Sequence, residues 1–182
     1  MRSTITRLRD IMPLRRLSRA ESLRVAEAQA RRLLRLSEVS EPPVNDDVIA
    51  RLPHIQIERV KAAQAYAATE WSHGRWLIIL NGSESRGRQR WSLAHELKHI
   101  LDHPFVTIVY SRQDGCIAER ACDYFAACLL MPRRWLRPAW VNGNHDVRAL
   151  ARRFGVTPHA LLVRLLQIGL IEPTSRHLVK EA

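Results

Sequence analysis

The sequence predicts an α+β fold in which a small three-stranded antiparallel sheet precedes the main helices. Residues 55–60 alternate between apolar and polar side chains, which is typical of a half-buried strand. Residues 65–71 and 75–80 flank a Ser-His-Gly sequence, so they are expected to pair as a hairpin. From residue 91 onward, apolar residues instead recur every three or four positions, and this spacing predicts helices.

The first fifty residues are expected to form an arm followed by helices. Residues 1–19 are basic and predict a poorly ordered N-terminal arm, with local docking at 11–14, ahead of a domain over residues 20–182. Apolar side chains at helical spacing predict a helix over 20–37. Asn45 or Asp46 is placed to cap a short helix that reaches Leu52.

Two further helices are expected in the second half of the chain. The apolar periodicity of 91–101 ends just before Pro104, and that of 118–131 ends at Pro132, where proline stops a helix. The stretch between them, 103–115, reads as irregular, and a short strand over 106–110 is one interpretation of it.

Residues 95–99 read His-Glu-Leu-Lys-His, an HExxH pentad. On a helix, His95 and His99 lie one turn apart on the same face, so both imidazoles can bind one Zn²⁺ ion. Glu96 is then placed to act as the catalytic base that takes a proton from a water molecule. The alternative is a surface helix with two solvated histidines.

A third metal ligand is expected from the helix that follows. Glu119 and Asp123 are four residues apart and share a helix face. Glu119 is the best third ligand, and Asp123 could accept the second N–H of a ligand histidine, which fixes its tautomer. The alternative is that both are ordinary solvated acids.

Other ligand candidates are weaker. A longer HExxHxxGxxH pattern is excluded because Asp102 and Phe105 occupy the positions of its Gly and last His. His103 is one turn past His99 and fits better as a surface residue near a helix end. The three cysteines are six residues apart, so they are interpreted as small, largely buried thiols.

At these positions the chain resembles the ImmA/IrrE-type metallopeptidases. The run from Arg88 to His99 is similar to that family's HExxH block, and the run from Glu119 to Pro132 is similar to its second block. The resemblance covers about residues 20–171. It implies a compact zincin-like domain and regulatory proteolysis, often of a repressor. It also implies that His95, His99 and Glu119 are the ligands, with Glu96 as the general base and Asp123 beside them.

The chain departs from the family pattern at three positions. Lys98 stands where the family usually has Gly, and its long cationic side chain is expected at the cleft rim. Trp91 replaces Phe, and Cys122 replaces a small Ala. None of these changes removes an expected ligand.

The C-terminal helix pair, about 146–154 and 158–167, has two interpretations. Gly155 suits the end of the first helix, and Thr157 followed by Pro158 suits the start of the second. A helix-turn-helix interpretation predicts base contacts from His159 and Arg164. The favoured interpretation is structural, with both helices packed on the peptidase core and apolar residues such as Leu161 and Leu165 buried.

Composition narrows the class of protein. With 182 residues and 46% hydrophobic content, the chain is long enough for a real core, and it has no apolar run that would span a membrane. Three cysteines without framework spacing predict a reducing, cytoplasmic location. The net charge of +11 comes almost entirely from Arg and is concentrated in residues 1–36. This charge predicts either weak nucleic-acid contact through the N-terminus or a solvated basic face.

The main functional hypothesis is a zinc-dependent endopeptidase with one Zn²⁺ per chain, whose substrate is a regulatory protein such as a repressor encoded nearby. Tyr110, His73 and His145 are candidates for stabilising the transition state, and the strand at 65–71 for binding substrate along its edge. The alternatives are a non-enzymatic DNA-binding regulator and a degenerate zincin that serves as a toxin–antitoxin binding protein.

Overall fold

The computed structural model describes residues 2–61, 66–110, 115–143 and 145–172. Its elements, in chain order, are α1 (Thr4–Arg9), α2 (Arg19–Leu36), α3 (Asp47–Ala50), β1 (Ile55–Val60), β2 (Ala67–Ser72), β3 (Arg75–Asn81), α4 (Arg86–Asp102), the 3₁₀ turn η1 (His103–Phe105), α5 (Val106–Val109), α6 (Gly115–Leu130), α7 (Arg133–Val141), α8 (Val147–Phe154) and α9 (Pro158–Gln167). None of the described helices is long and apolar enough to cross a membrane.

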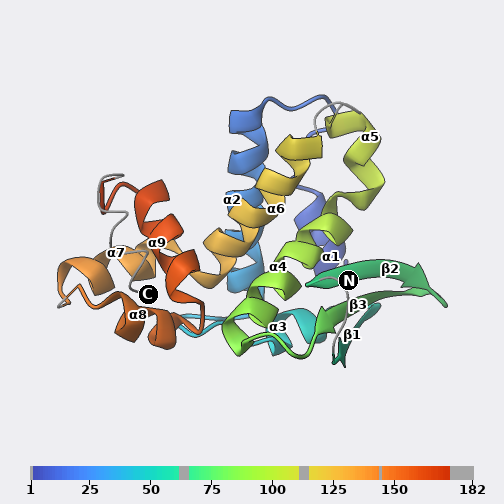
Figure 1. Cartoon of the computed structure of the whole chain (residues 1–182). Coiled ribbons are helices and arrows are strands. Elements are labelled where there is room, and N and C mark those ends of the chain that lie inside the picture. Colours follow the sequence, from blue (N-terminus) through green and yellow to red (C-terminus); the bar gives the residue numbers. More distant parts are fainter. Residues whose placement is uncertain (1, 62–65, 111–114, 144, 173–182) are drawn as a thin grey trace.

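The core forms where α6 packs against both α2 and α4, with the sheet beside α4 and the α7–α9 helices at the other end (Figure 1). Ala26, Ala30 and Leu33 line one face of α2 at helical spacing, and all three are completely buried. Phe125 and Leu129 do the same on α6. Small alanines on α2 allow the two helices to approach closely, so α6 is held firmly between its neighbours.

The sheet is mixed, which corrects the expectation of an antiparallel sheet. Its strand order is β1-β3-β2, with β1 parallel and β2 antiparallel to β3. The hairpin prediction is confirmed, although Ala65 lies outside the described residues. β3 takes the centre because it is the most apolar strand, and Ile78 and Leu80 on it are completely buried. Apolar and polar alternation within β1 does not encode the direction of its partner, so spacing alone could not predict the parallel pairing.

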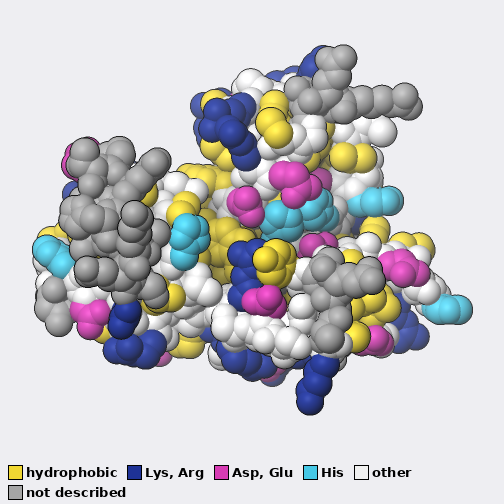
Figure 2. All heavy atoms as spheres, viewed as in Figure 1, with side chains coloured by type: hydrophobic (Ala, Val, Ile, Leu, Met, Phe, Trp, Pro, Cys, Tyr) yellow, Lys and Arg dark blue, Asp and Glu magenta, His cyan; other side chains and the backbone are white. Residues whose placement is uncertain are grey.

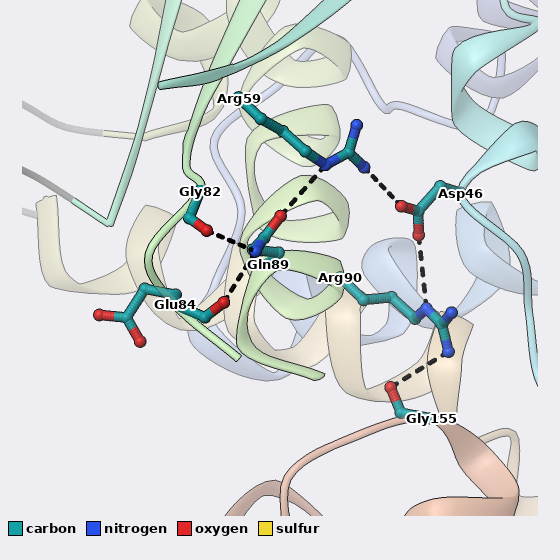
Figure 3. A network of polar contacts seen from close by, with 7 residues as sticks. All are labelled: Asp46, Arg59, Gly82, Glu84, Gln89, Arg90 and Gly155. Atoms are coloured by element: carbon teal, nitrogen blue, oxygen red, sulfur yellow. Dashed lines mark hydrogen bonds and ion pairs between the residues drawn. The ribbon is translucent and has the colours of Figure 1, made fainter. Parts of the chain in front are cut away.

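The start of α4 is fixed by a polar network that reaches three parts of the chain (Figure 3). Asp46 does not cap α3 through its side chain. It accepts hydrogen bonds from Arg59 on β1, at 2.6 Å, and from Arg90 on α4, at 3.4 Å. Arg90 also donates to the carbonyl of Gly155, at 3.2 Å, so the network ties α4 to the loop between α8 and α9.

The N-terminal residues do not form the expected poorly ordered arm. Residues 4–9 form α1, which begins at the Ser3 cap, and Ile5 and Leu8 are buried in the core. Arg9 donates to the carbonyls of Ile100 and Leu101, at 2.7 and 3.3 Å. The apolar residues among the arginines are therefore docking residues, and the overall basic composition hides them.

Val106–Val109 form the short helix α5, so the interpretation of 106–110 as a strand is wrong. The helix α7 was not predicted from the sequence. It begins directly after Pro132, whose missing N–H is no loss at a helix start, and it continues through Pro138.

The C-terminal pair matches its expected boundaries. Thr157 caps α9 through the N–H of Ala160, and Gly155 ends α8 in the left-handed conformation. Leu161 and Leu165 are completely buried, which agrees with the structural interpretation of the pair. Residues 173–182, the end of the expected domain, lie outside the described part of the chain.

Arg164 is also buried, with 1% of its surface exposed, so the base contact that the helix-turn-helix interpretation predicts for it is wrong. Its guanidinium donates to the Met131 carbonyl and to the Cys128 thiol instead.

Candidate metal centre

Helix α4 carries the two histidines of the pentad on one face. The Nε2 atoms of His95 and His99 lie 3.1 Å apart, and both side chains are only partly buried. Figure 2 shows histidine side chains beside acidic ones on the face formed by α4 and α6. The helical spacing therefore aims two nitrogen donors at the same point.

Glu119 on α6 completes a three-residue cluster. Its carboxylate oxygens lie 3.3 Å from His95 Nε2 and 3.4 Å from His99 Nε2. Donors bound at about 2.0–2.1 Å to one tetrahedral metal ion are about 3.3 Å from each other. The two histidine nitrogens show this separation, and Glu119 places Oε2 near His95 and Oε1 near His99, so one metal ion could lie between the three side chains. The close packing of α4 and α6 brings the motif and its partner together.

Asp123 lies one turn further along α6 and contacts the other nitrogen of His95. Its Oδ1 is 3.0 Å from His95 Nδ1. Burial lowers the pKa of the His95 imidazole, yet the hydrogen bond with Asp123 and the nearby carboxylates outweigh burial and raise it. The same hydrogen bond lowers the pKa of Asp123. An Nδ1–H that donates to Asp123 leaves the Nε2 lone pair directed at the cluster.

The neighbouring sheet contacts the pentad through a residue that the sequence did not indicate. The Thr69 hydroxyl on β2 donates to Glu96 Oε2. β2 is an edge strand, so its free edge runs beside the candidate site. Thr69 belongs to no motif, and only the packing of β2 on α4 reveals its contact. The rotation of the Glu96 carboxylate is restrained by this hydroxyl.

Lys98 is completely buried, so the expectation that it lies at the cleft rim is wrong. Its ammonium contacts both carboxylate oxygens of Asp102, one helical turn away, and Tyr110 donates to the same carboxylate at 2.7 Å. Burial and Asp102 raise the pKa of the Tyr110 phenol. The Tyr110 hydroxyl thus already donates to Asp102, which argues against the expected role of Tyr110 in stabilising the transition state.

Cys122 offers a competing donor for a metal. Its Sγ and one nitrogen from each of His95 and His99 all lie within 4.8 Å of one another. Burial raises the pKa of the Cys122 thiol, whereas a metal binds the thiolate. The Glu119 side chain, by contrast, is 60% exposed. The chemistry of the donors thus favours the carboxylate. Cys122 and Cys128 are buried as expected, whereas Cys116 is exposed.

The remaining candidate residues lie in other parts of the fold. His73 is exposed on the β2–β3 turn with a positive φ of 49°. His145 stacks on Trp140 in the connection between α7 and α8, with ring centroids 4.6 Å apart. His103, at the end of α4, contacts the edge of the Trp76 ring. Among the described residues, His95, His99, Glu119 and Asp123 form the cluster, and these other histidines lie elsewhere.

The fold and the cluster define an α+β domain with a candidate metal site between two helices. Residues 53–166 match the family model described as the IrrE N-terminal-like domain, and the chain belongs to this family. This membership agrees with the resemblance found in the sequence and indicates a metallopeptidase-type domain.

The fold is also similar to a solved structure of a Mycobacterium tuberculosis transcriptional regulator. The TM-score is 0.64 at 17% sequence identity, and the match covers 91% of this chain. It covers 52% of the regulator, so the chain spans about half of that protein's length. A comparison with curated proteins gives no match.

Proposed function

We propose that this protein is a zinc-dependent endopeptidase on a zincin-like scaffold. The single observation that carries the proposal is the convergence of His95, His99 and Glu119, whose donor atoms are 3.1–3.4 Å apart. These three side chains would hold one Zn²⁺ per chain. Zinc, when bound, supplies a Lewis acid that polarises a peptide carbonyl and makes water more acidic.

The residues around the cluster have separate tasks in this proposal. Glu96 accepts a proton from the attacking water and returns it to the leaving amine. Thr69 holds the Glu96 carboxylate by a hydrogen bond, and Asp123 holds the His95 ring. The free edge of β2 binds the substrate as an added strand, which presents its backbone to Glu96.

The proposed substrate is a regulatory protein, with a repressor encoded near this chain as the first candidate. A repressor substrate places the reaction in the cytoplasm. The family supports a peptidase-type domain, and the similarity to a transcriptional regulator supports a regulatory setting.

Metal analysis tests the ligand set. We expect one zinc per wild-type chain and loss of zinc from His95→Ala, His99→Ala and Glu119→Ala. Asp123→Asn should bind zinc about 10–100-fold more weakly, because the residue orients a ligand. Glu70→Ala, which changes an exposed acid on β2, is the control and should retain full zinc content. Loss of zinc from Cys122→Ala with full retention in Glu119→Ala would replace the proposed ligand set with the histidine–cysteine set.

Cleavage of the neighbouring repressor tests the reaction. Wild-type protein loaded with zinc should cut it, and Glu96→Gln should retain zinc but lose cleavage because it removes the base and no ligand. An enzyme without Glu96 that cuts at the wild-type rate would refute the assignment of the base.

A second candidate function, nucleic-acid binding without proteolysis, is favoured by one groove. A groove of about 770 Å³ between α2 and α7 is lined by Arg31, Arg32, Arg35 and Arg134. The guanidinium of Arg134 lies over the partly buried Trp135 ring. A groove lined with arginines suits a phosphate backbone. Within residues 1–19, by contrast, Arg9 and Arg15 are held by other groups of the protein.

Duplex binding across a salt series tests this second function. If each residue contacts one phosphate, Arg31→Ala and Arg134→Ala should each reduce the slope of log binding constant against log salt concentration by about 0.9. Binding that is weak, insensitive to salt and unchanged by either substitution would reject it.

A further inference from the structure

A cavity of about 480 Å³ lies beside the proposed active site. Helix α1, the segment before β1, the end of the β2–β3 hairpin and the end of α4 line it, and Ile5, Pro53, Trp71, Trp76 and His103 are among its lining residues. The cavity is separate from the His95–His99–Glu119 cluster, and the roles proposed above do not use it.

Two elements lead from Glu96 to this cavity in the same direction. On β2, Trp71 follows Thr69 by two residues, so both side chains lie on one face of the strand, about 7 Å apart. On α4, His103 follows Glu96 by seven residues, which is two turns along the same face, or about 10 Å.

Contacts between aromatic rings show that the ends of β2 and α4 meet at the cavity. The Trp71 and Trp76 centroids are 5.2 Å apart, and the Trp76 and His103 centroids are 4.9 Å apart. Because Thr69 also contacts Glu96, β2 and α4 lie side by side from the proposed base to the cavity. An extended substrate on the edge of β2 advances about 3.3 Å per residue. Its second or third residue from the cleaved bond therefore reaches the cavity.

The lining defines which side chain fits. Trp71, Trp76 and Ile5 provide aromatic and aliphatic surface, and Trp71 is 54% exposed, so a ligand can cover it. The described lining residues include no acid. Arg9 also borders the cavity, but its guanidinium already donates to the carbonyls of Ile100 and Leu101. His54 and His103 add imidazole rings to the lining. A lysine or arginine side chain would meet apolar surface and like charge there.

We propose that this cavity is a specificity pocket that accepts a bulky aromatic or aliphatic side chain of the substrate and disfavours Lys and Arg. The selected residue lies two or three positions from the cleaved bond. This inference rests on the proposed peptidase function and adds the class of substrate residue that the enzyme selects. It also gives α1, the basic N-terminal segment, a place in substrate recognition as one wall of the pocket.

The test profiles cleavage of a proteome-derived peptide library by the zinc-loaded full chain, with cleavage sites read by mass spectrometry. Wild-type protein should enrich Phe, Tyr, Trp or Leu over Lys and Arg by about tenfold or more at one position, two or three residues from the cut. Trp71→Ala should lose most of this enrichment and leave the other positions unchanged. His103→Glu should admit Lys and Arg at that position, because it adds an acid to the lining.

Tyr66→Ala is the matched control. Tyr66 is an exposed aromatic just before β2, on the far side of Thr69 from the cavity. Its removal should leave the preference at the selected position unchanged. If Trp71→Ala and His103→Glu cleave with the wild-type profile, the pocket assignment is overturned and the peptidase proposal stands.

A binding measurement tests the pocket independently of peptide cleavage. N-acetyl-phenylalaninamide should shift the indole N–H resonance of Trp71 in the wild-type protein, assigned by its absence from Trp71→Ala, and N-acetyl-lysinamide should not. If the wild-type chain cleaves no peptide, the peptidase proposal fails, and this measurement alone decides whether the pocket binds aromatic side chains. Equal shifts from both amides, or none from either, would overturn the pocket.

Discussion

Replacing Lys98 with Met is expected to lower the free energy of unfolding by about 3–5 kcal/mol, the range for breaking a buried ion pair. Lys98 is completely buried, and Asp102 is 4% exposed. Removing the ammonium leaves the Asp102 carboxylate buried with the Tyr110 hydroxyl as its remaining donor among the described residues. A single domain is stabilised by about 5–15 kcal/mol in total, so this loss is a large part of it.

Urea unfolding of the metal-free protein, followed by circular dichroism, measures the effect. Asp102→Leu should be about as destabilising as Lys98→Met, because it leaves a buried cation. The double variant Lys98→Met/Asp102→Leu should be less destabilised than the sum of the two, with a coupling of about 2 kcal/mol or more. Tyr110→Phe removes one hydrogen bond to a charged group and should cost about 1.5–3 kcal/mol.

The chain offers a matched control with the same spacing. Arg51 and Asp47 also form an ion pair four residues apart, at 3.1 Å, but their side chains are 82% and 69% exposed. Arg51→Met should change stability by less than about 1 kcal/mol. If Lys98→Met resembles this control, or if the two single effects add, Lys98 lies at the surface and the reasoning from burial is refuted.

Three further predictions follow from other parts of the fold. Arg15 and Ser18 lower the pKa of Glu21 to about 2 from 4.5. The ionised Glu21 therefore stabilises the folded chain fully above pH 4.5, and this contribution is lost as the pH falls toward 2. The difference in melting temperature between wild type and Glu21→Gln should shrink over the same range. Arg164→Ala should destabilise by about 2–4 kcal/mol in urea, because it leaves buried partners unpaired. Gly87→Ala should destabilise by about 1–2 kcal/mol despite better helix propensity, since its Cβ would lie 2.8 Å from the Val156 carbonyl carbon.

Each of these predictions has its own contrary result. A melting-temperature gap that stays constant from pH 6 to pH 2 would show that Glu21 keeps its ordinary pKa in the folded chain. Arg164→Ala should differ clearly from the exposed Arg152→Ala, and equal stabilities would contradict the burial of Arg164. A Gly87→Ala protein that is more stable than wild type would show that α4 can move away from the α8–α9 loop.

The sequence predicted the parts of the site that depend on spacing within one helix. His95 and His99 share a face because they are four residues apart, and so do Glu119 and Asp123. The packing of α4 on α6 then brings the two pairs together, as expected from the family resemblance. Helix boundaries near prolines and caps were also predictable, since these signals are local.

The remaining features depend on contacts between segments far apart in the chain. Thr69 contacts Glu96 only because β2 packs on α4. The parallel pairing of β1 with β3 depends on which strand is apolar enough for the centre of the sheet. The prediction of a poorly ordered N-terminus was wrong because it rested on the arginine content. The apolar residues Ile5 and Leu8 between the arginines dock α1 on the core.

In the sequence, Lys98 and Cys122 are two separate departures from the family pattern, but the fold places them in one buried unit. Lys98 pairs with Asp102, and both act on the Cys122 thiol, whose pKa is raised chiefly by burial. A chain with Gly at position 98 and Asp at 102 would bury a carboxylate without a cation beside it, so each residue stabilises the fold only in the presence of the other. The pair links successive turns of α4 on either side of His99. Lys98 therefore contributes to holding the proposed ligand in place from inside the core, and substrate at the cleft does not reach it.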